Sequence, residues 1–272
     1  MKKIAVFLMV MFLVLSLSSC GVSKKAKGKV LESEQSHDLA NEMESAYNQR
    51  QGDPFKGWIS IEYESKEKEK EKDGSYEITE VKIKGKIFES SEFKNVKAVI
   101  EYEEKISSYD ADTTIRLVST EKVKLVCMDG KNYVITKTKQ TTSSDYGKSK
   151  ETEVERTRSD ADSISIPGID TEVSSKSSVM DSMLLGLVYL LKYEDVYKSG
   201  NTYFYENGDE EKLMVMSMVV DNNFKVKKVT VYEKENETYS NQTTYESVSK
   251  AIIKRSTGRI IIKPSQSSFK KI

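Results

Sequence analysis

The chain has 272 residues, enough for one large domain or two small ones, and it carries 43 basic and 43 acidic side chains. Because the charges balance and no basic patch dominates the sequence, nucleic acid is not an expected partner. Charged residues make up 32% of the chain and are finely interspersed with apolar ones, a pattern typical of a solvated β surface.

The first twenty residues have the three parts of an export signal. Lys2 and Lys3 give a positive start, residues 4–15 are continuously apolar, and small residues precede Cys20. The apolar stretch is shorter than the roughly 20 residues that a membrane-spanning helix needs. An uncleaved N-terminal anchor with a chance cysteine is the alternative, but the spacing and the residue types favour cleavage.

The four residues Leu17-Ser18-Ser19-Cys20 resemble the lipobox of bacterial lipoproteins. The resemblance implies a signal peptide over residues 1–19, cleavage between Ser19 and Cys20, and a diacylglyceryl group on Cys20. Each buried methylene contributes about 0.8 kcal/mol, and stable anchoring takes two or more acyl chains. We therefore expect the mature protein to be held on the extracytoplasmic face of the cell membrane by acylated Cys20, without spanning the membrane.

Residues 20–35 predict a flexible tether, and a single β-rich domain is expected over residues 36–272. Ser36 is a candidate N-cap for an amphipathic helix that Gly52 and Pro54 would end. The apolar face of this helix is formed by Leu39, Met43, Ala46 and Tyr47.

From Trp58 the hydrophobic period changes to two, which predicts antiparallel strands with one buried face. Asp129-Gly130 predicts a hairpin turn between two of these strands. Because Tyr76 and Ile78 are out of phase with Val81, a bulge or a switch of faces is expected between them. The predicted strands of this first meander cover residues 59–64, 76–87, 96–103, 123–128 and 133–136.

Residues 138–177 are mostly polar and small, and they separate the first meander from an apolar segment. This composition predicts a mobile hairpin or loop region centred on Pro167-Gly168. A domain boundary within the same residues is the alternative.

Residues 179–191 form the most apolar segment of the mature chain, and their apolar side chains cover nearly the whole circumference of a helix. Such a helix is buried on most sides or lies in lipid, and this one is too short to span a bilayer. We expect it to be enclosed by the sheet, or to act as a gate over an apolar cavity. The candidate gate residues are Met180, Met183, Leu184, Leu187 and Leu191.

The β pattern returns after this helix, with a turn at Asp221-Asn222-Asn223. Residues 239–254 fit a helix or a strand equally well. Predicted strands cover residues 202–205, 213–220, 224–233 and 259–263. The strand at 213–220 is apolar on both faces, and its flexible methionines suit an irregular ligand. The candidate cavity-wall residues are Met214, Met216 and Met218.

Catalysis has little support in the sequence. His37 is the only histidine, and its place at a helix start beside the tether favours an exposed cap residue. With Cys20 lipidated, Cys127 is left without a disulfide partner, and a buried inert thiol is the favoured interpretation. No CxxC pair, HExxH motif or clustered metal-ligand spacing occurs. We therefore expect no enzyme activity, metal or cofactor.

The order of lipobox, tether, helix, meander, apolar helix and second meander resembles the half-barrel superfamily of the lipoprotein carrier LolA and the mycobacterial LppX/LprG lipoproteins. The hairpin over residues 212–232 is similar to the late hairpin of that superfamily. The resemblance implies an α+β fold, mostly antiparallel: a curved sheet or half-barrel with an N-terminal helix and a central apolar helix on its concave face. A lipid or another hydrophobic ligand would then bind inside. The alternative is a surface interaction or structural lipoprotein with a filled core and an unknown protein partner.

Overall fold

The computed structural model describes residues 26–49, 57–89, 95–160, 163–166, 169–174 and 179–256. These residues form antiparallel strands and two helices. In chain order the elements are β1 (Lys29–Val30), α2 (Ser33–Gln49), β2 (Gly57–Lys70), β3 (Tyr76–Glu89), β4 (Lys97–Tyr109), β5 (Arg116–Met128), β6 (Lys131–Ser144), β7 (Gly147–Asp160), β8 (Ser163–Ile166), β9 (Ile169–Ser174), α3 (Val179–Tyr193), β10 (Val196–Ser199), β11 (Thr202–Gly208), β12 (Lys212–Val220), β13 (Val226–Thr238) and β14 (Thr244–Ser256).

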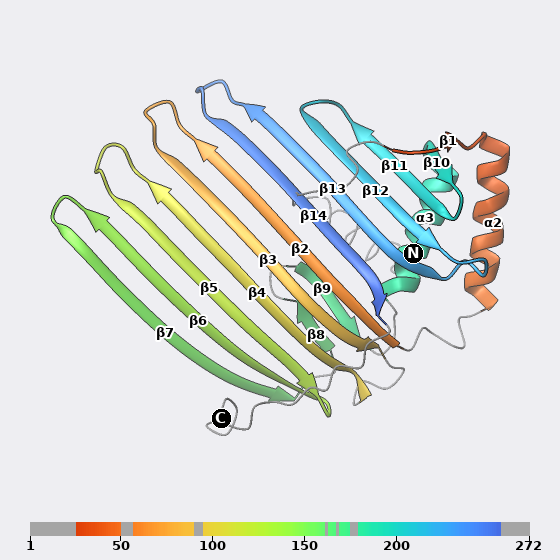
Figure 1. Ribbon diagram of the computed structural model, residues 1–272, viewed down its shortest axis with the longest axis horizontal. Helices are drawn as coiled ribbons and strands as arrows, with labels where there is room; N and C mark the ends of the chain where they lie inside the picture. Colours follow the sequence, from red (N-terminus) through yellow and green to blue (C-terminus); the bar gives the residue numbers. More distant parts are fainter. Residues whose placement is uncertain are drawn as a thin grey trace.

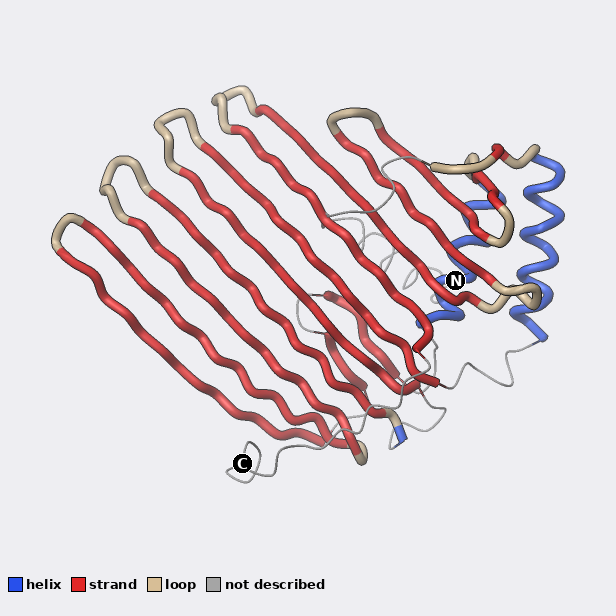
Figure 2. The backbone as a smooth tube through the Cα atoms, viewed as in Figure 1, coloured by secondary structure: helices blue, strands red, loops and turns tan. Residues whose placement is uncertain are grey.

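Twelve strands pair into one curved, unclosed sheet, as Figures 1 and 2 show. The strand order is β1-β10-β11-β12-β13-β14-β2-β3-β4-β5-β6-β7, so β14 joins the C-terminal meander to the N-terminal one. Strands β8 and β9 form a separate two-stranded sheet. The predicted class, a mostly antiparallel curved sheet with an N-terminal helix and a central apolar helix, is confirmed at this level.

The two faces of the sheet differ because side chains alternate along each strand. We call the face that carries Ile61, Ile83, Ile100 and Met216 the inner face, since α3 joins these residues in one core. The opposite face is the outer face. In Figure 1, α3 and the β8–β9 hairpin both lie on the same side of the sheet.

Helix α3 is tied to α2 near its C-terminal end. Ser36 Oγ donates a hydrogen bond of 2.7 Å to the carbonyl oxygen of Leu191. Lys192 Nζ pairs with Glu44, and His37 Nε2 lies 3.1 Å from the Lys192 carbonyl oxygen. These contacts fix the last turn of α3 against the N-terminal helix.

The other end of α3 is held by the sheet. Glu89, the last residue of β3, is only 4% exposed, and its Oε1 accepts a hydrogen bond of 2.7 Å from the backbone N–H of Val179. The first N–H groups of a helix have no partner within the helix, and the helix dipole favours a negative charge there. Glu89 therefore caps the N-terminus of α3, and the backbone N–H of Val179 satisfies its buried carboxylate.

Two expectations at the N-terminus need correction. The first helix begins at Ser33, so Ser36 is not its N-cap but bonds to α3 from inside the helix. The predicted tether over residues 20–35 is also too long, because Lys29–Val30 already pairs with β10. A short strand requires only backbone hydrogen bonds, and the local composition gave no periodic signal for it.

The structure also decides four expectations about strands. Of the two alternatives expected between Ile78 and Val81, the switch of faces is confirmed and the bulge is not: β3 pairs in unbroken register, and the two residues lie on opposite faces. Residues 138–160, predicted as part of a mobile hairpin or loop, belong to the long strands β6 and β7. The hairpin centred on residues 167–168 is confirmed as β8–β9. The ambiguous segment 239–254 is resolved as a strand, β14, from Thr244 onward.

Both predicted turns are confirmed. Asp129 and Gly130 have φ angles of 54° and 70°, as a tight two-residue hairpin turn requires. Asp221 Oδ1 accepts hydrogen bonds from the backbone of Asn223 and Lys225, which closes the turn between β12 and β13.

Several expectations concern residues outside those described. They are the signal peptide at 1–19, the lipidated Cys20 and the strand at 259–263. Among the residues that the structure does describe, no helix is long and apolar enough to cross a membrane.

We expect Glu89→Ala to lower the free energy of unfolding by about 2 kcal/mol, because a charge-assisted hydrogen bond to the first turn of α3 is lost. Urea unfolding of the mature chain measures this. Glu77→Ala is the matched control, since Glu77 is an exposed glutamate on the same face of the same strand. Equal stability of the two variants would contradict the capping role.

Candidate functional site

The structure brings the eight predicted gate and wall residues together on the inner face. The five residues from α3 are 0–7% exposed, and Met216 and Met218 are 4% and 1% exposed. Met214 is partly buried against the same core. In Figure 1, α3 lies behind the C-terminal half of the sheet. Sequence periodicity therefore found one continuous apolar cluster, while the presence of a ligand cavity within it stays a prediction.

The apolar inner face extends well beyond α3. Ile83, Ile100, Leu125 and Cys127 are buried on β3, β4 and β5, at 0–4% exposure. The β8–β9 hairpin, which supplies the fully buried Ile164, lies over this part of the sheet in Figure 1. Because the hairpin is a sheet of its own, it is held there without strand pairing to the large sheet.

A polar band borders this apolar region on the inner face, toward the hairpin turns that join β2 to β3 and β13 to β14. Hydroxyl and carboxyl groups replace aliphatic side chains in successive alternating positions of the same strands. The band comprises Tyr63, Ser65, Glu67, Tyr102, Glu104, Glu233, Glu235, Tyr245, Ser247 and Ser249. Of these residues, Tyr63, Ser65, Glu233, Ser247 and Ser249 are at most 7% exposed.

The titration of the band reflects burial and like charge. Burial raises the pKa of Glu67, a hydrogen bond from Tyr245 partly offsets this, and the negative charges of Glu104 and Glu235 raise it further. Burial also raises the pKa of Tyr63 and of Tyr102. The tyrosines thus stay protonated donors, and burial together with the neighbouring negative charges disfavours the charged form of Glu67.

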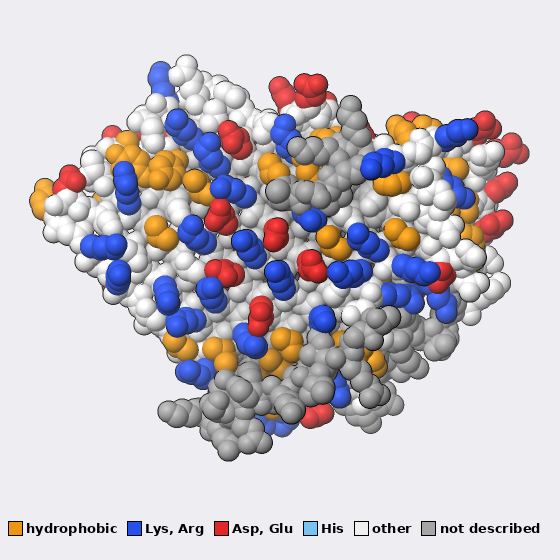
Figure 3. All heavy atoms as spheres, in the orientation of Figure 1, with side chains coloured by type: hydrophobic (Ala, Val, Ile, Leu, Met, Phe, Trp, Pro, Cys, Tyr) orange, Lys and Arg blue, Asp and Glu red, His pale blue; other side chains and the backbone are white. Residues whose placement is uncertain are grey.

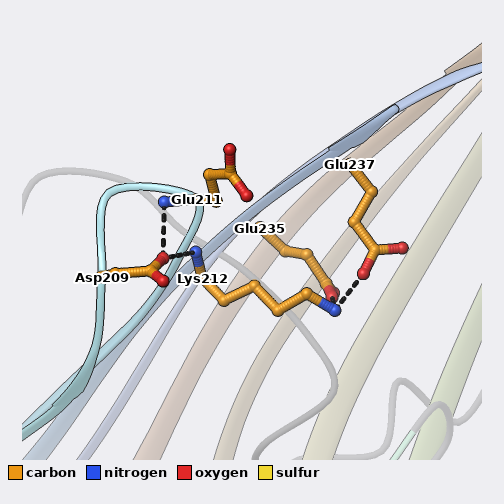
Figure 4. A network of polar contacts seen from close by, with 5 residues as sticks. All are labelled: Asp209, Glu211, Lys212, Glu235 and Glu237. Atoms are coloured by element: carbon orange, nitrogen blue, oxygen red, sulfur yellow. Dashed lines mark hydrogen bonds and ion pairs between the residues drawn. The ribbon is translucent and has the colours of Figure 1, made fainter. Parts of the chain in front are cut away.

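Lys212 provides a positive charge beside the band residue Glu235 and the neighbouring Glu237. Lys212 Nζ lies 2.6 Å from Glu235 Oε1 and also pairs with Glu237, as Figure 4 shows. Asp209 Oδ1 accepts hydrogen bonds from the backbone N–H groups of Glu211 and Lys212, which orders the turn that leads into β12. These contacts lower the pKa of Glu237 and raise that of Lys212.

Cys127 is a buried thiol on the inner face of β5. Burial raises the pKa of the Cys127 thiol to about 11, with a smaller effect from Asp129, so the thiol is protonated and buried as expected. Within the described residues no group of three or more His, Cys, Asp or Glu side chains is arranged to hold a metal ion.

Sequence reasoning missed the polar band. Its signal was present in the alternation: Tyr63, Ser65 and Glu67 continue the inner-face positions of Ile59 and Ile61. The interpretation of acidic residues as a uniformly solvated surface hid the fact that they occupy both faces.

Two solved structures resemble this chain at low sequence identity. No protein-family model matches the sequence, and no curated protein matches it. The translocator domain of the autotransporter NalP from Neisseria meningitidis is 10% identical, with a TM-score of 0.34, over 82% of this chain and 98% of that one. A porin-like protein from Bacteroides uniformis is 8% identical, with a TM-score of 0.15, over 74% of this chain and 96% of that one. At these TM-scores neither likeness carries an argument about this chain.

We expect Glu67→Gln to raise the free energy of unfolding at pH 7. A carboxyl whose pKa is raised in the folded state binds more protons when folded, so its contribution to stability falls as pH rises from its ordinary pKa through the raised one. The gain over wild type should therefore shrink as pH falls below about 4, where both states are protonated.

Thermal unfolding between pH 3.5 and 7.5 measures this difference. Glu69→Gln is the control, because Glu69 is exposed two residues further along the same face. A Glu67→Gln variant that is less stable than wild type at pH 7 would show that the charge contributes favourably.

Proposed function

We propose that this protein is a membrane-anchored lipoprotein of the bacterial cell envelope that binds a lipid or another hydrophobic ligand against the inner face of its sheet. The anchor is acylated Cys20, on the strength of the lipobox resemblance. The ligand site is the apolar inner face of β3–β5, next to α3. The half-barrel resemblance to LolA and LppX belongs to the same proposal.

One observation carries the ligand site: the apolar inner face extends beyond α3, and Ile164 of the separate β8–β9 hairpin joins the same core. Helix α3 is bonded to Glu89 at one end and to α2 at the other. In our proposal it is a fixed wall, and β8–β9 is the part that moves. A hydrophobic ligand could replace the hairpin's contacts at little net cost, because both bury similar apolar area.

The polar band would orient an amphiphilic ligand in the site. An amphiphile would place its chains against Ile83, Ile100 and Leu125, and its polar end beside Tyr63 and Tyr102. Protonated tyrosines are hydrogen-bond donors in an otherwise apolar surface, which is the usual way that apolar sites orient a ligand.

A second function is favoured by a specific observation. The candidate residues of α3 and β12 pack tightly on one another, as the filled core of a structural or surface interaction lipoprotein would. In that case the exposed β6–β7 hairpin would form the interaction surface for a partner. The two functions differ in whether the purified protein retains a hydrophobic molecule.

The anchor is tested with two cysteine variants of the full chain in a bacterial host. Cys20→Ser should abolish the mass increase of a lipid modification and release the protein from the membrane fraction. Cys127→Ser should leave both unchanged, because Cys127 is buried inside the domain. A membrane-bound, unmodified Cys20→Ser protein would contradict lipid anchoring.

The ligand is tested by native mass spectrometry of the mature chain with Cys20→Ser, followed by denaturation. A released species of lipid mass is the expected result. Val134→Trp should reduce the bound fraction several-fold, since Val134 lies on the inner face beside the core. Ile135→Trp, one residue on and facing outward, should not. A protein that carries no such species and binds no added lipid would support the filled-core function.

A further inference from the structure

The charges of the N-terminal meander are sorted by face. Because β2–β7 pair in unbroken register, the side of every residue follows from the strand alternation. Every Lys and Arg of these six strands lies on the outer face. They are Lys66, Lys68, Lys70, Lys82, Lys84, Lys86, Lys97, Lys105, Arg116, Lys122, Lys124, Lys131, Lys137, Lys139, Lys148, Lys150, Arg156 and Arg158. Figure 3 shows Lys and Arg side chains spread over one face of the molecule, with Asp and Glu side chains among them.

Acidic side chains offset these cations only in part. Across β2–β5 the outer-face acids pair with lysines, as in Lys124–Glu101 at 3.0 Å and Lys122–Glu103 at 2.9 Å. On the outer face of β6 and β7 the only acid is Asp160, which lies 3.7 Å from Lys131. This leaves an exposed group that we call the cationic patch. It consists of Lys137, Lys139, Lys148, Lys150, Arg156 and Arg158.

Among the described residues no ion pair involves the six cations of the patch, although the Arg158 guanidinium lies 5.8 Å from the centre of the Tyr133 ring. The side chains of the patch are exposed, and β7 is exposed along its whole length on both faces. Lys137 stands directly opposite Lys122 in the β5–β6 register, and Lys122 is already paired with Glu103 at 2.9 Å. An anionic surface would supply a counter-charge to Lys137 and to the other cations of the patch.

Apolar and aromatic side chains lie among these cations on the same face. Val118 and Val154 are 39% and 42% exposed, and both point outward. The Arg116 guanidinium lies 5.3 Å from the centre of the Tyr109 ring, which in turn packs on Tyr76. Basic residues mixed with tyrosine and aliphatic groups match the interface of an anionic bilayer better than they match a fully hydrated polyanion.

Ala26, the first residue that the structure describes, contacts the outer face at the opposite edge of the sheet from the cationic patch. The backbone N–H of Ala26 donates to the carboxylate of Glu206, whose register with Val215 places it on the outer face. Cys20 precedes Ala26 by six residues. A fully extended segment of that length reaches about 21 Å, so an anchor on Cys20 would keep the outer face close to the bilayer at the β1–β11 edge, which is the edge opposite β7.

We propose that the cationic patch docks on the surface of an anionic lipid bilayer. The docking rests on the membrane location proposed above but not on the ligand site. The carboxylates of the opposite face, such as Glu151, Glu153 and Glu155, do not prevent it. At 0.1 M salt the Debye length is about 10 Å, so solvated charges on the far side of the sheet are largely screened from the bilayer. The inner face is thereby turned away from the membrane.

A second copy of the chain is a poor occupant of this edge. If β7 paired antiparallel with another β7, outer-face residues would oppose outer-face residues. Lys148 and Lys150 would then approach Arg156 and Arg158, and like charges directly opposite destabilise a sheet. The edge is protected from self-association, and the charge remains available to a lipid surface.

Vesicle co-sedimentation with the mature Cys20→Ser chain tests the proposal. This chain lacks the acyl anchor, and the test needs no bound hydrophobic ligand. The protein should sediment with vesicles of phosphatidylglycerol and phosphatidylcholine at 0.1 M salt, and not with phosphatidylcholine alone. Neutralising four cations should weaken binding more than about tenfold, since each basic residue near such a surface contributes about one kcal/mol. The four substitutions are Lys137→Gln, Lys139→Gln, Arg156→Gln and Arg158→Gln.

The control variant changes the net charge by the same amount on the inner face of the same two strands. Its substitutions are Gln140→Glu, Ser149→Glu, Thr157→Glu and Ser159→Glu, and binding should stay within about twofold of wild type. Circular dichroism and thermal unfolding establish that both variants are folded. Equal loss of binding in the two variants would overturn the proposal, because net charge alone would then explain it. Binding to soluble polyphosphate but not to vesicles would also overturn it.

Discussion

The unbroken pairing of β2–β7 is the constraint on which the rest of the molecule depends. Side chains alternate with a period of two, so a slip of one residue in any hairpin would exchange its faces. Over these six strands no register shift occurs. Every cation of these six strands therefore lies on the outer face, while acidic, apolar and tyrosine side chains occupy both faces. A chain with balanced charge is in this way polarised across one sheet.

The difference between the two faces relates the proposed ligand site to the proposed membrane docking. The inner face offers aliphatic side chains from β3, β4 and β5, with hydroxyl groups at their edge. The outer face offers cations, which near the β7 edge exceed the acids. Helix α3 is fixed by Glu89 and Ser36, so the inner face has one rigid wall and one independent cover. A domain docked through its outer face would keep that cover free to move.

Much of this fold could be predicted from the sequence, because its elements follow strong periodicities. The all-round apolar helix, the methionine strand and the Asp129-Gly130 turn were confirmed by the structure. The long β6–β7 hairpin was missed, since its residues are polar on both faces and alternate in charge sign instead of hydrophobicity. Strand β1 was missed because two residues carry no periodic signal.

The candidate site was predicted only in its apolar half. Met216, Met218 and the α3 residues share a core, as their spacing indicated. The polar band and the cationic patch depend on which strands lie side by side, and a sequence does not reveal that β14 pairs with β2. Positive charges are spread evenly along the sequence, so no basic patch was expected. In the folded sheet, strand alternation brings the Lys and Arg side chains of β6 and β7 together on the outer face.

The most direct test of the two-faced sheet uses adjacent threonines of β6 that point to opposite faces. Thr141 pairs with Lys150 on the outer face, and Thr142 pairs with Ser149 on the inner face. Each is replaced by cysteine in a Cys20→Ser, Cys127→Ser mature chain and labelled with a polarity-sensitive fluorophore. On addition of anionic vesicles, the account predicts a blue shift from the probe at Thr141→Cys and none from the probe at Thr142→Cys. Equal shifts at both positions, or a shift at the inner position alone, would contradict it.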